Sequence, residues 1–411
     1  MSSYSTRLVR VSNPNIASLL ADAPSVRDTI LAAAAAARGI PGADPRAMTH
    51  SWLFTGPPGS GRSNAALAFA AAVMCPVEPG CGCGNCESCR DILVFHKHTD
   101  LVFVQPRELS IAVEDVREWV EDAARLPTNS PWRFIIFDNA DRLTNEASNA
   151  LLKTVEEPSA STVLVMCAPS TDPEDFSQTL RSRCRHVYVP MPSAQKVVDV
   201  LVAEGHGEEA ARLAAAATVR HIGRARHLVS SPDAQKRRAQ TLALAEEVFR
   251  GGSGFVAASR LVKGVGKEEA EIGKKIDQEE KERLELAYGS GARGKGTAKA
   301  KKDIKVAVEK LEKLQKKRVT RRLRDALDLV LVDLAGLYRD ALMLQTGAQV
   351  EPTHPDFAGL AQELAQRVPE QGLLACIDAT ATCRSHMAEN VTPEIAFAGM
   401  IGRLRMACGV K

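Results

Sequence analysis

The feature that most constrains this chain is a glycine-rich loop, Gly56-Pro57-Pro58-Gly59-Ser60-Gly61-Arg62-Ser63. An apolar run from Trp52 to Thr55 precedes the loop, and a helical pattern from Asn64 to Met74 follows it. Between a strand and a helix, such a loop lets backbone N–H groups converge on phosphate oxygens at a helix N-terminus. An incidental Gly-Pro turn before a helix is the alternative. The candidate nucleotide-binding residues here are Gly56, Gly59, Gly61, Arg62 and Ser63.

The pattern around this loop predicts an α/β domain followed by helices. Further short apolar runs alternate with helical patterns, at Leu101 to Val104, Phe134 to Phe137, Val163 to Cys167 and Val187 to Val189. This alternation is typical of a parallel sheet with crossover helices. After Pro192 the strand-like runs disappear. We therefore expect an α/β P-loop domain with a parallel sheet over residues 1–190, a small helical lid over 191–250 and an all-α C-terminal domain over 251–411.

The C-terminal region contains a break at Gly251-Gly252-Ser253-Gly254 and a second glycine-rich loop from Tyr288 to Gly296. Charged helical patterns flank the second loop and predict a projecting hairpin over about residues 264–320, with Ile304, Val308 and Leu311 as its apolar stripe. Both signs of charge are interspersed, which is typical of a solvated surface. The basic run from Lys316 to Arg322 leaves DNA contact open as an alternative.

Charge and hydropathy exclude some classes of function. With 53 basic and 50 acidic side chains, the net charge of +3 provides no global basic field for holding DNA, so any nucleic-acid contact must be local. No apolar run approaches the ~20 residues of a membrane helix, and the N-terminus lacks a secretory pattern. We expect a cytoplasmic protein without a membrane partner. In that reducing compartment a tight cluster among the ten cysteines indicates metal rather than disulfides.

Such a cluster follows the phosphate loop. Three cysteines have Cys-x2-Cys-x2-Cys spacing and a fourth ends the preceding helix, so the predicted zinc ligands are Cys75, Cys83, Cys86 and Cys89. Four thiolates with no open position make a structural zinc site. A ferredoxin cluster would need its next ligand at Leu93, which disfavours that alternative. Cys81 stays open as a competing ligand, and His96 and His98 are expected to be ordinary loop histidines.

Two substitutions weaken the predicted nucleotide site. Arg62 stands where the motif has lysine, and a planar guanidinium does not place its charge on phosphates as a compact ammonium does. Asp138 follows the run Phe134 to Phe137 and would hold Mg²⁺ together with Ser63. The next residue is Asn139, where ATPases with this loop carry a glutamate, and a carboxamide cannot accept the proton of the attacking water. We expect slow or no hydrolysis, and binding of ATP and Mg²⁺ stays open.

Two further runs are more specific, from Asn149 to Pro158 and from Thr179 to Cys184. With the loop upstream, they resemble bacterial clamp-loader subunits of the AAA+ family, most clearly from about His50 to Pro190. The resemblance implies that Arg183 is an arginine finger for ATP held by an adjacent subunit, an effect worth ~10³ to 10⁵ in rate. A surface salt bridge is the alternative for this residue. The resemblance also places Ser170 or Thr171 near sensor 1 and Arg226 near sensor 2.

Within the family, Arg62 and Asn139 are typical of the delta prime class, which assists hydrolysis rather than performing it. The partners implied by this resemblance are the gamma/tau and delta subunits, the sliding clamp and primer–template DNA, within the DNA polymerase holoenzyme. The C-terminal helices would form a collar that joins subunits into a ring. Two alternatives stay open: a self-sufficient AAA+ ATPase like gamma/tau, and a zinc-dependent nucleic-acid-binding module with vestigial ATPase features.

Overall fold

The computed structural model describes residues 15–106, 110–287, 297–389 and 391–410. It divides into two compact units. The first comprises residues 1–205 with Arg220–Gly223, and the second comprises His206–Val219 with Arg224–Lys411. The three-domain division with boundaries at 190 and 250 stays a prediction. The glycine-rich loop from Tyr288 to Gly296 lies outside the described residues.

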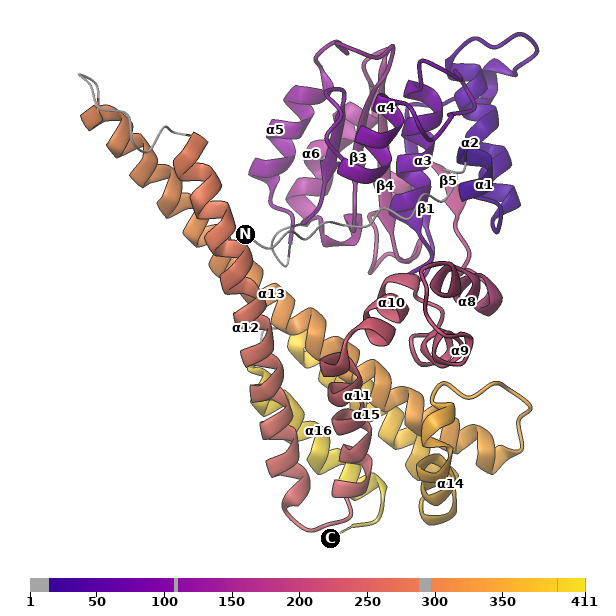
Figure 1. Ribbon diagram of the computed structural model, residues 1–411, viewed down its shortest axis with the longest axis vertical. Helices are drawn as coiled ribbons and strands as arrows, with labels where there is room; N and C mark the ends of the chain where they lie inside the picture. The colour runs from indigo at the N-terminus through magenta and orange to yellow at the C-terminus, as the bar shows by residue number, and fades with distance from the viewer. Residues whose placement is uncertain (1–14, 107–109, 288–296, 390, 411) are drawn as a thin grey trace. The chain divides into compact units, whose positions relative to one another are not determined.

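The first unit is built on a five-stranded parallel sheet with the order β2-β3-β4-β1-β5 (Figure 1). Its strands are β1 Ser51–Thr55, β2 Leu101–Val104, β3 Arg133–Phe137, β4 Thr162–Ala168 and β5 Arg185–Tyr188. All five predicted strands and the predicted fold class are confirmed. The fifth strand begins at Arg185, slightly before its apolar run, because pairing with β1 extends it over polar residues. The central β1 places the phosphate loop between β4 and β5.

Helices cover both faces of this sheet (Figure 1). One face packs against α3, where small alanine side chains let the helix approach closely, and the core there contains Trp52, Phe69 and Phe134. The other face packs against α5 and α6 through Val116 and Leu151. The helical elements of the unit are α1 Ile16–Leu19, α2 Pro24–Ala37, η1 Pro45–Ala47, α3 Arg62–Met74, α4 Glu87–Arg90, η2 Asp91–Phe95, α5 Val113–Ala123, η3 Ala140–Arg142, α6 Asn145–Glu156, α7 Gln178–Arg181 and α8 Ala194–Ala203.

A buried carboxylate fixes the loop that leads into β3. Asp100 is fully buried and accepts hydrogen bonds from the backbone N–H groups of Thr128 (2.6 Å), Asn129 (2.7 Å) and Ser130 (2.9 Å). The buried Arg133 guanidinium lies 3.5 Å away. Burial acts to raise the pKa of Asp100, but the backbone hydrogen bonds outweigh it and lower the pKa below its ordinary value. The charged form of Asp100 is therefore part of the folded core.

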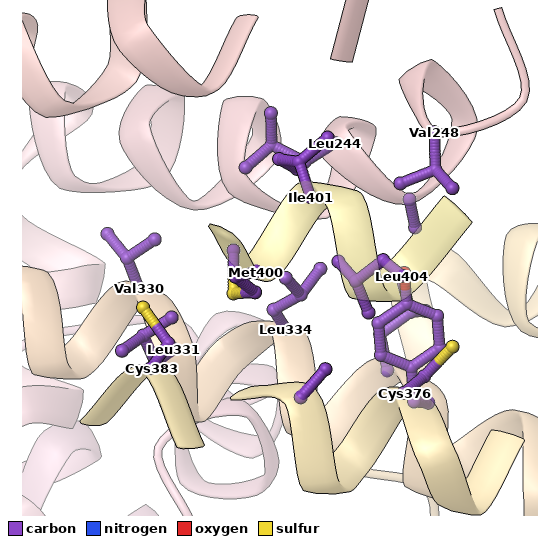
Figure 2. Close-up of a cluster of buried hydrophobic side chains, with 14 of the residues drawn as sticks. Leu244, Val248, Val330, Leu331, Leu334, Cys376, Cys383, Met400, Ile401 and Leu404 are labelled. Atoms are coloured by element: carbon purple, nitrogen blue, oxygen red, sulfur yellow. The ribbon is translucent and has the colours of Figure 1, made fainter. Parts of the chain in front are cut away.

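The second unit is all-helical over its described residues, as predicted. Its elements are α9 Glu208–Ala217, α10 Ile222–Ser230, α11 Pro232–Glu247, α12 Ser253–Ala287, α13 Thr297–Thr346, η4 Pro355–Phe357, α14 Ala358–Arg367, α15 Glu370–Ala388 and α16 Pro393–Ala407, with the start of α10 shared with the first unit. Its core joins α11, α13, α15 and α16 through side chains such as Leu244, Leu334, Cys376 and Leu404 (Figure 2). None of the described helices combines the length and apolar character needed to cross a membrane.

The predicted break after residue 250 is shorter than expected. Gly251 and Gly252 form the turn, whereas Ser253 and Gly254 already belong to α12. Gly254 fits there because a Cβ would lie only 3.2 Å from the Glu247 carbonyl oxygen and from the Ile401 side chain. Close packing between neighbouring helices therefore extends α12 into the glycine-rich run.

The helices α12 and α13 run side by side as a long hairpin that extends from the rest of the second unit (Figure 1). Arg318 pairs with Asp277 at 2.7 Å and with Glu280 at 2.6 Å, and Arg322 pairs with Glu269 at 3.1 Å. These arginines belong to the basic run for which DNA contact was the alternative. Their pairing across the hairpin supports a structural role for them. Of the predicted apolar stripe, Val308 and Leu311 are half-buried, and the side chain of Ile304 lies outside the described residues.

Candidate functional site

The phosphate loop has the predicted strand–loop–helix form. It leaves β1 at Thr55, and α3 begins at Arg62 with Gly61 as its N-cap in the left-handed region at φ 86°. Gly59 is also left-handed at φ 94°, and a Cβ at Gly56 would collide with the carbonyl oxygen of Val189. Glycine is required at these positions because other residues adopt such backbone conformations only with strain or overlap. The loop thus has the backbone of a phosphate cradle.

Two predicted magnesium ligands, Ser63 at the end of this loop and Asp138 after β3, lie together. The Ser63 hydroxyl donates a hydrogen bond to Asp138 Oδ1 at 2.5 Å, and Asp138 directly follows β3. Asn139 comes next in the left-handed region at φ 57°. The hydroxyl and carboxylate suit Mg²⁺, but the neighbouring carboxamide supplies no general base. The arrangement could hold a cation without being able to activate water through Asn139.

Arg62 is buried, with only 8% of its surface exposed. Its Nη1 has no hydrogen-bond partner among the described residues, and the same is true of the buried Ser60 Oγ and Asp141 Oδ1. Burial raises the pKa of Asp141, so its charge is also poorly compensated. The Arg62 and Ser60 donors suit an anion, whereas the Asp141 carboxylate oxygen, an acceptor, does not. These three atoms are shielded from solvent, whereas Pro58 in the same loop is exposed and Gly59 is half-exposed.

His221 packs against the phosphate loop at Gly59. A Cβ on Gly59 would lie 2.7 Å from both Cγ and Cδ2 of the His221 ring, so the imidazole packs directly against the loop. This residue was missed at the level of sequence, where no pattern links position 221 to position 59. Nucleotide binding at this loop stays a prediction.

Arg183 lies on the surface just after α7 Gln178–Arg181. Its Nε donates to Glu156 Oε1 at 2.6 Å, and its Nη1 donates to the carbonyl oxygen of Thr179 at 2.9 Å. The side chains of Arg183 and Glu156 are 37% and 48% exposed, so the ion pair is solvated. The salt bridge that was the alternative for Arg183 is thus present. Because the pair is exposed, the guanidinium is also available to another molecule.

The two sensor assignments stay predictions. Ser170 follows β4 and donates its hydroxyl to Asp175 Oδ2 at 2.6 Å, while the preceding Pro169 carbonyl accepts a hydrogen bond from the Gly56 amide at 3.2 Å. The segment after β4 therefore contacts the phosphate loop through its backbone. Arg226 lies on α10 in the second unit and is exposed.

The structure brings the four predicted zinc ligands together. The sulfur of Cys75 lies 3.6 Å from that of Cys83 and 3.8 Å from that of Cys86, and the Cys83 and Cys89 sulfurs are 4.0 Å apart. A tetrahedral ion with metal–sulfur bonds of about 2.3 Å places its ligands ~3.8 Å apart. All four sulfur atoms lie within 4.8 Å of one another. The cluster therefore has the dimensions of a four-thiolate metal site.

Backbone amides support this cluster. The N–H groups of Glu78 and Cys86 donate to the sulfurs of Cys75 and Cys83, each at 3.3 Å. Burial acts to raise the pKa of Cys83, but hydrogen bonds from the Asn85 and Cys86 backbones outweigh it and lower the pKa to about 7, whereas burial raises the pKa of Cys86 and of Cys89. Such bonds stabilise thiolates, the form that binds metal. The donor set fits zinc in number, chemistry and spacing.

The remaining candidates lie outside the cluster. Cys81 is exposed and is not among the four grouped sulfurs. His96 stacks on Phe103 with ring centroids 4.8 Å apart, and His98 Nδ1 accepts the Asp100 amide at 3.1 Å. Both histidines therefore have the loop roles expected of them. The turn itself is made by Gly82 at φ 76° and Gly84 at φ 74°, two glycines of the zinc module.

Known proteins resemble this part of the chain. Residues 43–193 match the family described as DNA polymerase III, delta subunit. DNA polymerase III subunit delta' of Bacillus subtilis is 29% identical over 199 residues, which cover 48% of this chain and 59% of the relative. Subunit delta' of Pseudomonas aeruginosa is 32% identical over 148 residues, which cover 35% and 44%. Subunit gamma/tau of Mycobacterium tuberculosis is 34% identical over 140 residues, which cover 34% and 24%.

These matches confirm the predicted resemblance to bacterial clamp-loader subunits. The matches span about half of the length of the two delta' relatives, so they concern the α/β region and not the whole protein. Identity to the gamma/tau relative is as high as to the delta' relatives. Sequence identity alone therefore does not separate the two classes, and the chemistry of individual residues must do so.

Proposed function

We propose that this chain, whose residues 43–193 belong with the bacterial DNA polymerase III clamp-loader subunits, acts in the delta prime class. In that role it would assemble with gamma/tau and delta subunits to load the sliding clamp on primed DNA. It would lend Arg183 to ATP held by a neighbouring subunit and hydrolyse ATP poorly or not at all itself. The observation that carries the proposal is the contrast between a phosphate loop whose neighbouring Asn139 supplies no general base and the exposed finger candidate Arg183.

The composition of the chain's own phosphate site supports the proposal that the chain hydrolyses ATP poorly or not at all. Asn139 cannot take a proton from water, and the buried Arg62 does not offer the compact ammonium of a lysine. Asn139 affects the activation of water, and Arg62 affects contact with the phosphates. Their coincidence favours a subunit that does not hydrolyse ATP.

The surroundings of Arg183 support the proposal that it acts on ATP held by a neighbouring subunit. An exposed ion pair is worth about 0–1 kcal/mol, so releasing Arg183 from Glu156 costs little. A guanidinium placed on the γ-phosphate of a neighbour would neutralise charge that develops during phosphoryl transfer. The pair with Glu156 holds the side chain near the surface without burying it. The salt bridge and the finger are therefore compatible roles for one residue.

We also propose that the four-thiolate cluster binds zinc as a structural ion. Its ligands are Cys75 and the three cysteines of the Cys-x2-Cys-x2-Cys run, with no position left open for a substrate. Zinc would cross-link the end of α3 to the short helix α4 Glu87–Arg90. Its contribution would be to the fold of the module, not to a reaction.

Reconstitution with gamma/tau and delta subunits tests the proposed role. We expect Arg183→Ala to lower DNA-stimulated ATP hydrolysis by the assembled complex about 10³-fold. Asp138→Ala should leave it nearly unchanged, because the site in this chain is not used. Arg181→Ala, which removes an exposed arginine two residues away, is the matched control. Wild-type rates with Arg183→Ala in a complex that still assembles would refute the finger.

A self-sufficient ATPase is the second candidate, and the Ser63–Asp138 hydrogen bond of 2.5 Å is the observation in its favour. The hydrogen bond shows that the chain retains, side by side, the hydroxyl and the carboxylate that would hold Mg²⁺. Brisk hydrolysis by the purified chain, abolished by Asp138→Ala, would establish this candidate. Tight DNA binding by the isolated chain that is lost on removal of zinc would instead favour the zinc-dependent nucleic-acid-binding module.

A further inference from the structure

We infer that a basic face of α13, in the long helical hairpin, binds the phosphate backbone of duplex DNA without regard to base sequence. The basic face consists of the exposed side chains of Lys305, Lys313 and Lys316. The inference rests on the proposed function, in which the assembled complex acts on primed DNA. It goes beyond that function because it names a DNA-binding surface outside the α/β unit.

The two helices of the hairpin carry opposite net charges. Residues 267–287 of α12 contain eight acidic and five basic side chains, whereas residues 297–324 of α13 contain twelve basic and three acidic ones. The two signs are therefore mixed over the hairpin as a whole but separated between its helices. Because the whole chain has a net charge of only +3, contact with nucleic acid requires a local concentration of positive charge, and α13 provides one.

The ion pairs across the hairpin use arginines of α13 and leave lysines exposed. Arg318 and Arg322 pair with acidic side chains of α12. Lys305, Lys313 and Lys316 are exposed, and none of them forms an ion pair with another described residue. Because an α-helix turns by about 100° per residue, these three lysines lie within about 80° of one another around the helix axis. They therefore share one face of α13.

Few acidic side chains oppose this basic face. Glu309 lies among the three lysines, and it is the one exposed acidic residue that the structure describes between residues 305 and 320. Glu312 is half-buried and accepts a hydrogen bond from Lys281 of α12 at 2.7 Å, so its charge is already paired. On the surface of α12, by contrast, exposed glutamates such as Glu271 alternate with exposed lysines. The exposed surface of α13 is therefore more positive than that of α12.

The composition of the hairpin favours duplex DNA over other anionic partners. Residues 264–287 and 297–324 contain no aromatic or histidine side chain, whereas proteins that bind single strands stack bases on such rings. Gln315 is buried and donates to the Asp277 carbonyl oxygen at 3.1 Å, so this amide does not read a base edge. Duplex DNA carries one negative charge per about 1.7 Å of its axis. An ordinary protein surface mixes both signs of charge, so charge complementarity favours the duplex.

Binding of a fluorescent DNA duplex to the full-length chain, measured by anisotropy over a range of salt concentrations, tests the inference. We expect the triple variant Lys305→Gln, Lys313→Gln and Lys316→Gln to bind about 10²-fold more weakly than the wild type at low salt. The slope of log affinity against log salt concentration should become less steep by about 3, because each phosphate contact contributes about 0.9. Glutamine is a good helix former, so circular dichroism should show an intact hairpin.

Three exposed lysines of α12 provide the matched control, the triple variant Lys267→Gln, Lys274→Gln and Lys275→Gln. It loses the same charge from the other helix and should bind the duplex nearly as tightly as the wild type. Equal weakening by both triple variants, an unchanged salt slope in the α13 variant, or tighter binding of single-stranded than of duplex DNA would overturn the inference. Unchanged duplex binding together with weaker assembly on gamma/tau and delta would assign the basic face to a protein partner instead.

The reconstituted complex separates this inference from the proposed function. The α13 variant should raise the concentration of primed DNA that gives half-maximal ATP hydrolysis and should leave the maximal rate at saturating DNA unchanged. Arg183→Ala should instead lower the maximal rate itself. A lower maximal rate of the α13 variant at saturating DNA would contradict a role in DNA binding alone.

Discussion

Arg62 and Arg183 are two arginines of the same α/β unit in opposite settings. Arg62 lies in the phosphate loop, 8% exposed, with Nη1 unpaired within the described structure. Arg183 lies on the surface, with its side chain 37% exposed and paired to Glu156. A buried charge acts only on what is built around it, whereas an exposed one can change partners at little cost. The contrast teaches that local motif and accessibility have to be considered together.

The largest effect in the comparison of Arg62 with Arg183 is expected when the charge of Arg183 is kept and the shape of its side chain is changed. Arg183→Lys retains a cation but loses the planar, two-pronged donor that matches a phosphate. We expect DNA-stimulated hydrolysis by the reconstituted complex to fall about 10²-fold, the loss typical for one transition-state donor. Arg181→Lys should have no effect. Full activity of Arg183→Lys would mean that only charge at this position matters.

Buried charge is tested at Asp100, which pairs with the buried Arg133. Asp100→Asn removes the carboxylate that accepts three backbone hydrogen bonds, and hydrogen bonds to a charged group contribute about 1.5–3 kcal/mol. We expect the free energy of unfolding in urea to fall by about 2 kcal/mol or more. The exposed Asp172→Asn is a control of the same chemistry. Equal stabilities would contradict the assigned role.

Asp100 also determines the direction in which stability changes with pH. Because the folded-state pKa of Asp100 is lowered, its stabilisation is complete above the unfolded pKa of about 3.9 and is lost as pH falls through the lower folded value. We therefore expect the stability difference between wild type and Asp100→Asn to shrink in acid. Urea unfolding at neutral pH and near pH 3 measures it. A stability difference that grows in acid would contradict a lowered pKa of Asp100 in the folded state.

A smaller effect is expected at Val219, where the strain lies in the backbone rather than in a charge. Val219 is 49% exposed, so Val219→Gly removes left-handed strain with little loss of packing. Relief of about 1–2 kcal/mol is partly offset by the greater entropy of glycine in the unfolded chain. We expect the free energy of unfolding, measured by thermal denaturation, to rise by about 0.5 kcal/mol. Val202→Gly, at an exposed valine in the ordinary helix α8, should instead destabilise.

The smallest effect is expected at Glu156, the surface partner of Arg183. Glu156→Gln should change the free energy of unfolding by less than about 0.5–1 kcal/mol, because the ion pair is solvated. Hydrolysis by the complex should stay within about twofold of wild type, since a guanidinium released from Glu156 still reaches its partner. A large loss of stability would mean that the pair is structural and that the contrast with Arg62 is weaker than argued.

Sequence patterns predicted the elements of this fold well and their contacts poorly. The five strands follow from short apolar runs, and the phosphate loop follows from glycines at fixed spacing. The hairpin also follows from its charge pattern, although its ion pairs, such as Arg318 with Glu280, could not be assigned to partners. The position of His221 against Gly59 was not predicted at all. Arg318 and Glu280 are 38 residues apart in the sequence, and contacts between such distant residues depend on how whole helices pack.

By itself, the sequence determined the parallel α/β unit, the all-helical region after it and the four cysteines at metal-binding spacing. These follow from periodicity and short-range spacing, which act within a few residues of the chain. Only the tertiary structure decided that Cys81 lies outside the cluster, that Arg183 pairs with Glu156 and that His221 packs against Gly59. The reason is physical: exposure and partnership of a side chain depend on what the folded chain brings beside it.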